Sequence, residues 1–275
     1  MKDYYYLLAG LPELLPAQEQ YKIDFDEIFG IIRDNLSGHE FALSQFLIYP
    51  HDNKNLIRSI AHQTDRPSPY PFHVQPETVS EDTIASYHKS TDGLPAYMIK
   101  FLDEQAENLS ATGLTELETK LNDYLFEAAI QQDDDFIREY YDFLYRLNNI
   151  KAAYNSRYFD YELARHLNQD FDINKILSKN TSSDFGLSQQ YLFMESLNGK
   201  FEEKKGYELE RTFEKIIWEF LDETTRFSFF NRHKLFAYLV KLLMVKRWMD
   251  LQPEAGKKRL EELTDKILQT EDDQR

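Results

Sequence analysis

Residues 133–158 read DDDFIREYYDFLYRLNNIKAAYNSRY, and this stretch decides the fold class. Its large apolar residues recur at steps of three and four, which places them on one face of a helix. They are Phe136, Tyr140, Phe143, Leu147, Ile150 and Tyr154. Three aspartates precede them, where negative charge favours the start of a helix, and metal binding is the alternative role of this triplet. The stretch predicts one long amphipathic helix packed against a core.

Helical spacing continues on both sides of this stretch. It predicts helices over residues 24–36, 39–49, 52–62, 80–88, 114–131, 207–225 and 231–251, with others starting at Pro95 and Pro253. The apolar run of residues 4–11 fits either a strand or a first helix. Only 9 Gly and 9 Pro interrupt 275 residues, which favours long helices over a strand-rich fold. We therefore expect an all-α, multi-helix protein that is more than half helical.

Two irregular stretches divide the predicted helices. Residues 66–76 contain four prolines, which exclude regular structure, so this stretch is a candidate linker. Residues 181–186 form a second predicted loop. The resulting subdivision is a first helical unit over 1–66, a central unit with the long helix over 77–180 and a C-terminal unit over 187–270.

The sequence contains no recognisable catalytic motif. It has no cysteine, so thiolate nucleophiles and Cys-ligated zinc are excluded. Gly-rich phosphate loops, the GxSxG motif and the HExxH motif are also missing. We expect no catalytic, cofactor or metal site, with an enzyme built from dispersed Asp, Glu and His residues as an alternative. No run approaches the roughly 20 apolar residues of a membrane span and no secretory signal is visible, so we expect a soluble, cytoplasmic protein.

Charge is unevenly distributed along the chain. The net charge is −16, which disfavours nucleic-acid binding, yet the span from Arg226 to Arg259 holds nine basic residues and two acids. Its cations either pair internally with the acidic remainder or form a docking face for an acidic protein surface or lipid headgroups. The candidate partner-binding residues are Arg232, Lys234, Lys241, Arg247, Lys257, Lys258 and Arg259. On the predicted helix after Asn231, the positions expected to face the core are Leu235, Tyr238, Leu239, Leu242 and Trp248.

Several segments resemble one protein family, the C/d-subunit family of the V/A-type rotary ATPases, whose eukaryotic members are the d subunits. The opening, Tyr4 to Leu14 (YYYLLAGLPEL), resembles the start of an uncharacterised bacterial branch that is a remote version of this family. Residues 144–151 (LYRLNNIK), followed by Arg157, are similar to the family's recurring helix with an Asn-Leu-Lys-like step and a later Arg. Residues 52–58 (DNKNLIR) are a weaker match to the same helix, and residues 236–241 (FAYLVK) resemble the family's closing helix.

This resemblance implies a mechanical role. Members of the C/d-subunit family consist of three related helical domains arranged as a funnel. They are adaptors without chemistry of their own: they link the central stalk to the membrane rotor ring, so that ATP hydrolysis or synthesis is coupled to H⁺ or Na⁺ transport. The implied location is the cytoplasmic, inner face of the membrane, with peripheral contact to the membrane complex. The alternative from the residues alone is a helical protein-interaction scaffold unrelated to ATPases.

Overall fold

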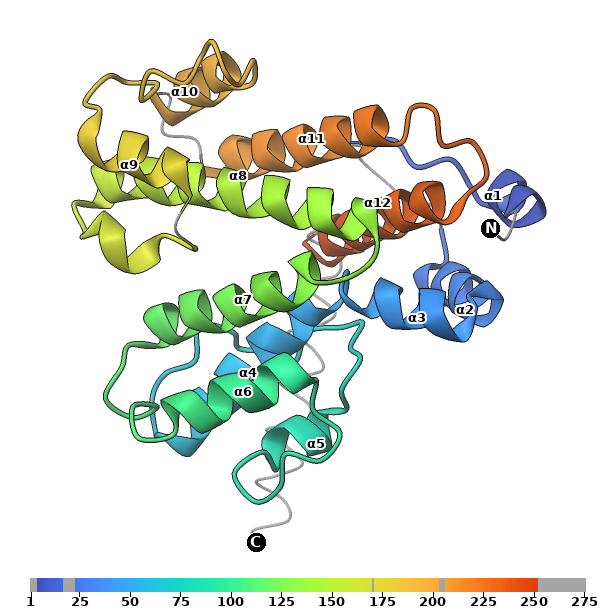
Figure 1. Ribbon diagram of the computed structural model, residues 1–275, viewed down its shortest axis with the longest axis horizontal. Helices are drawn as coiled ribbons and strands as arrows, with labels where there is room; N and C mark the ends of the chain where they lie inside the picture. Colours follow the sequence, from blue (N-terminus) through green and yellow to red (C-terminus); the bar gives the residue numbers. More distant parts are fainter. Residues whose placement is uncertain (1–3, 17–22, 170, 203–205, 252–275) are drawn as a thin grey trace, which may run out of the picture. The chain divides into compact units, whose positions relative to one another are not determined.

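The prediction of an all-helical, mainly α protein is confirmed by a computed structural model (Figure 1). It describes residues 4–16, 23–169, 171–202 and 206–251. Within these ranges the chain forms twelve α-helices, one 3₁₀ helix and no strand. The helices are α1 (Tyr5–Gly10), α2 (Phe25–Asn35), α3 (Gly38–Gln45), α4 (Tyr49–Gln63), α5 (Glu81–Ala85), α6 (Ala96–Gln105), α7 (Leu114–Ile130), α8 (Asp135–Phe159), η1 (Leu163–His166), α9 (Asp172–Lys179), α10 (Met194–Glu202), α11 (Gly206–Thr224) and α12 (Arg232–Asp250).

The predicted helix starts rest on side-chain caps. Asp24 accepts a hydrogen bond from the backbone N–H of Glu27 and begins α2, and Asn231 caps α12 through the N–H of Lys234. Asp134, the middle residue of the aspartate triplet, caps α8 through the N–H of Ile137. This is a structural role at a helix N-terminus. The apolar run at the N-terminus is helical, as α1.

Three elements were not predicted: α9, α10 and η1. Helix α9 has eight residues and α10 has nine, so each shows barely two turns of periodicity. Helix α9, η1 and α10 each contact the long helix α8. Figure 1 shows α9 lying against one end of α8. The helix predicted from Pro253 lies outside the described residues.

The chain forms two compact units. One comprises Met1–Leu36 and Glu214–Arg275, and the other comprises Ser37–Phe213. The subdivision into 1–66, 77–180 and 187–270 therefore places its breaks inside the second unit. The proline-rich stretch is irregular, as predicted, but it is attached to its own unit: the Arg66 guanidinium donates to the carbonyls of Leu109 and Thr112 at 2.7 and 2.6 Å.

Within the second unit, one side-chain arrangement occurs twice. The side-chain amide of Asn55, in α4, donates to the Val74 carbonyl at 2.9 Å and accepts from the Val74 N–H at 2.7 Å. Asn149, in α8, makes the same pair of bonds with the backbone of Asn168, at 2.7 and 2.8 Å. In both cases the clamped residue lies 19 positions further along the chain. Each buried asparagine therefore fixes the irregular segment that follows its helix.

The backbone after each of these helices also corresponds. Asp65 follows α4 with a φ of 52°, and Asp160 ends α8 with a φ of 53°. Further on, Gly93 and Gly186 adopt φ values of 85° and 70°, and each is followed by a buried leucine. Gly186 has no room for a side chain, since a Cβ atom there would meet Asn180 Nδ2 at 2.7 Å. These turns occur in similar sequences, STDGL (90–94) and SSDFGL (182–187).

The order of helices completes this correspondence. The series α4, α5, α6, α7 is matched by α8, α9, α10, α11, with η1 as an addition after α8. Figure 1 shows α4, α6 and α7 side by side, and α7 packs against both of the others. Asn55 and Asn149 thus occupy corresponding places in two related helical segments. Helix α12, which carries Tyr238, follows α11 as α8 follows α7.

Candidate docking surface

The predicted basic residues of α12 lie in the first unit, and Lys241 is turned inward. Its side chain is only 12% exposed, and its Nζ lies 2.6 Å from the Asp222 carboxylate and 4.7 Å from the centre of the Trp218 ring. Burial lowers the pKa of Lys241, while Asp222 opposes that shift. The expectation that Lys241 faces outward is wrong, because its ammonium group is needed beside Asp222 within the unit.

Other cations of the basic span also have partners within the first unit. Arg247 pairs with Glu214, and Lys246 lies 2.7 Å from Asp250. Lys234 Nζ lies 3.4 Å from the Thr225 hydroxyl. The structure therefore favours internal pairing for much of this charge. Arg232 is half-buried at the start of α12, and Lys257, Lys258 and Arg259 lie outside the described residues.

Helix α12 is buried around most of its circumference, since Phe236, Val240 and Leu243 are buried in addition to positions of the predicted face. Leu235, Leu239 and Leu242 are buried, as predicted. Tyr238 is half-buried and its hydroxyl donates to the Pro12 carbonyl at 2.9 Å, and Trp248 is also half-buried. These contacts and the packing of α12 against α2 hold the first unit together.

Two strongly exposed apolar side chains of the first unit were not predicted. They lie in residues 226–230, Arg-Phe-Ser-Phe-Phe, which join α11 to α12 and which we call the aromatic loop. Phe227 is 84% exposed and Phe229 is 69% exposed. Tyr6, in the neighbouring α1, is also exposed. Large apolar groups gathered on a surface mark sites of contact with other molecules. Three phenylalanines between two helices were the available signal in the sequence.

Contacts at both ends fix the aromatic loop. The Tyr4 N–H donates to the Phe230 carbonyl at 2.8 Å, and the rings of Tyr5 and Phe230 lie 4.5 Å apart. At the other end, the buried Thr225 accepts through its carbonyl from the Ser228 N–H at 3.0 Å. The backbone of the aromatic loop, which joins α11 to α12 in Figure 1, is therefore held at both ends.

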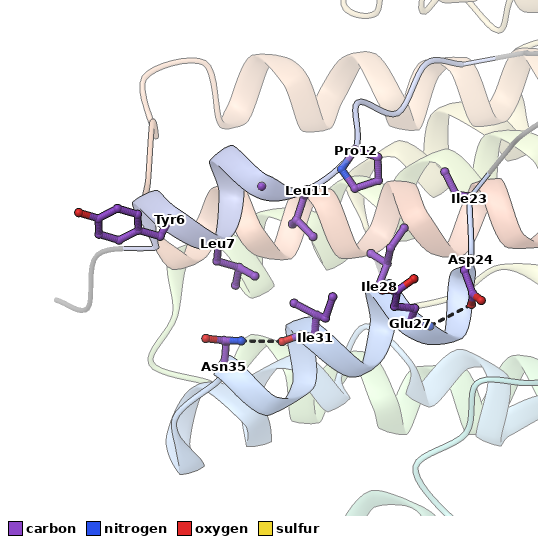
Figure 2. Close-up of a pocket in the computed structure, with 11 residues that line it drawn as sticks. Tyr6, Leu7, Leu11, Pro12, Ile23, Asp24, Glu27, Ile28, Ile31 and Asn35 are labelled. Carbon is purple, nitrogen blue, oxygen red and sulfur yellow. Dashed lines mark hydrogen bonds between the residues drawn. The ribbon is translucent and has the colours of Figure 1, made fainter.

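A cleft of about 560 Å³ lies between α1 and α2. Figure 2 shows Leu7 of α1 and Leu11, which directly follows α1, directed toward Ile28 and Ile31 of α2. Asp24 and Glu27 stand at one end, joined by the capping hydrogen bond. The cleft is lined by aliphatic side chains along its length and by two carboxylates at one end.

No group of three or more His, Asp or Glu side chains within the described ranges could hold a metal ion. One buried acid stands out: Asp52 of α4, whose pKa burial raises to about 6. Its carboxylate accepts from the N–H and hydroxyl of Thr78 at 3.1 and 2.5 Å, so it fixes the loop before α5. Among the helices of the described ranges, none has the length and apolar character to cross a membrane.

These features define an all-helical protein with a repeated helical segment and an exposed aromatic surface. The chain belongs to the family described as "Protein of unknown function (DUF2764)", whose model matches residues 1–271. No curated protein and no solved structure was found to match it.

Proposed function

We propose that this protein is a non-catalytic adaptor subunit of a V/A-type rotary ATPase, linking the central stalk to the membrane rotor ring. The repeated asparagine clamp carries this proposal. The resemblance to the C/d-subunit family implies a chain built from related helical domains. Asn55 and Asn149, the two asparagines of the resembling segments, hold the same backbone contact at corresponding places.

The two buried asparagines of the second unit support the mechanical part of the role. An adaptor that transmits torque must resist deformation between its two binding faces. Each clamp joins a helix to the irregular segment that follows it through hydrogen bonds of a buried asparagine side chain. Peripheral attachment at the cytoplasmic face of the membrane is the location that this role requires.

Co-expression with candidate partners tests the proposal. The full chain, co-expressed with the central-stalk subunit and the rotor ring of its host's rotary ATPase, should form a complex that persists through gel filtration. The catalytic head subunits of the same ATPase serve as the negative control. Failure to bind both the stalk subunit and the ring at micromolar concentration would rule the adaptor out. Stable capture of unrelated proteins would instead favour the general helical scaffold.

A further inference from the structure

The aromatic loop combines outward-facing rings with a cation, Arg226, at its first position. Phe227 and Phe229 expose most of their side chains, whereas Phe230 packs on Tyr5. Phe230, which is 39% exposed, is thus held by a ring contact and a backbone hydrogen bond, while the two rings before it project further into water. Such exposure is costly unless the rings are covered by another molecule.

Basic residues predominate on the C-terminal side of these rings. From Arg226 to Met249 the sequence holds six Lys and Arg residues and no acid, in a chain of net charge −16, and Lys241, Lys246 and Arg247 among them pair with acids of the same unit. Two acids precede the loop: Asp222 pairs with Lys241, and Glu223 pairs with Arg226 at 3.3 Å in a solvent-exposed contact. Exposed pairs of this kind are weak and exchange readily for other anions.

We propose that the aromatic loop docks on the surface of a lipid bilayer that contains anionic lipids. Phe227 and Phe229 enter the apolar edge of the interface, and Arg226 meets the headgroup phosphates. In an anionic bilayer, the apolar acyl chains lie directly beneath negatively charged headgroups. Aromatic residues next to a cationic residue can bind both layers at once. The rings protrude from a loop tip, whereas a protein partner would need an apolar pocket ringed by acids. The proposal requires no rotary ATPase.

Vesicle sedimentation tests this inference on the full chain. The probes are vesicles of phosphatidylcholine with phosphatidylglycerol, and vesicles of phosphatidylcholine alone. The wild type should sediment with the anionic vesicles and bind the neutral ones more weakly. Phe227→Ser with Phe229→Ser should weaken binding by about 100-fold, since burying one Phe side chain accounts for about a factor of ten or more. Arg226→Glu should weaken binding to the anionic vesicles only.

Phe159→Ser is the matched control. The exposed fraction of Phe159, 66%, is similar to that of Phe229, 69%. Phe159 lies in the second unit and is followed by Asp160. This variant should bind vesicles like the wild type. Because all the substituted rings are exposed, every variant should keep its melting temperature, which is measured first.

Two outcomes would overturn the proposal: no sedimentation of the wild type with anionic vesicles, or equal sedimentation of the double variant. If the double variant loses the stalk subunit or the ring while the wild type ignores protein-free vesicles, the loop is a protein contact and the lipid proposal fails. Vesicle binding without any ATPase partner would leave the loop's role intact and remove the adaptor function alone.

Discussion

Replacing Asn149 by alanine should be among the most damaging single changes in this protein. The side chain is fully buried and makes three hydrogen bonds: to the Asn168 carbonyl at 2.7 Å, from the Asn168 N–H at 2.8 Å and to Asn174 Oδ1 at 2.9 Å. A buried group left without its partner costs about 1–3 kcal/mol. The Asn168 carbonyl keeps a longer contact with Asn174, at 3.5 Å, so the loss is incomplete. We expect Asn149→Ala to lower the free energy of unfolding by about 3–5 kcal/mol.

Asn55→Ala is the corresponding change in the segment that begins with α4, and it tests the other asparagine clamp. Asn55→Ala removes the two bonds to Val74, so we expect a loss of about 2–4 kcal/mol. Asn148→Ala is the matched control, because Asn148 precedes Asn149 in the same helix and is exposed. It should change stability by less than about 0.5 kcal/mol.

Urea unfolding followed by circular dichroism measures all three variants. The comparison is valid where the dependence on urea keeps its slope, because a changed slope signals a different unfolded or partly folded state. A loss below about 1 kcal/mol for Asn149→Ala would refute the clamp as a stabilising device. A large loss at Asn149 with none at Asn55 would show that the two segments correspond in geometry but not in energy.

Three further predictions concern charge and ligands. Because the pKa of Asp52 is raised from 3.8 to about 6 in the folded chain, this group adds stability as pH falls through 6 toward 3.8, by about 3 kcal/mol in all. Asp52→Asn should flatten this slope between pH 6 and pH 3.8 in urea unfolding, and an unchanged slope would contradict the burial of the carboxyl. Lys241→Glu places a second carboxylate opposite Asp222, whereas Lys241→Met keeps the packing on Trp218. The Glu variant should therefore have the lower melting temperature of the two. Equal melting temperatures would mean that the ion pair contributes nothing to stability. Titration calorimetry of the full chain with Mg-ATP should give no binding heat, and micromolar affinity would require another function.

Local sequence determined the helices of this protein. The stripe from Phe136 to Tyr154 predicts α8, and helical spacing over residues 24–36 and 231–251 predicts α2 and α12, because apolar periodicity acts within a few residues of the chain. The scarcity of glycine and proline excluded a strand-rich fold for the same local reason. Helices α9 and α10 were missed, because eight and nine residues show barely two turns of periodicity.

The tertiary structure decided which partners the polar side chains of these helices have. Lys241 lies on a helix whose charge predicted a docking face, yet Asp222 and Trp218 come from a different helix and draw it inward. The two clamps likewise join residues 19 positions apart through a loop whose path no helical period specifies. Helical spacing acts over a few residues, whereas the pairing of a buried amide or ammonium group depends on which distant segment the fold brings within hydrogen-bonding distance. For that reason the sequence predicted the helices of this protein, and only the structure showed that one arrangement of them occurs twice.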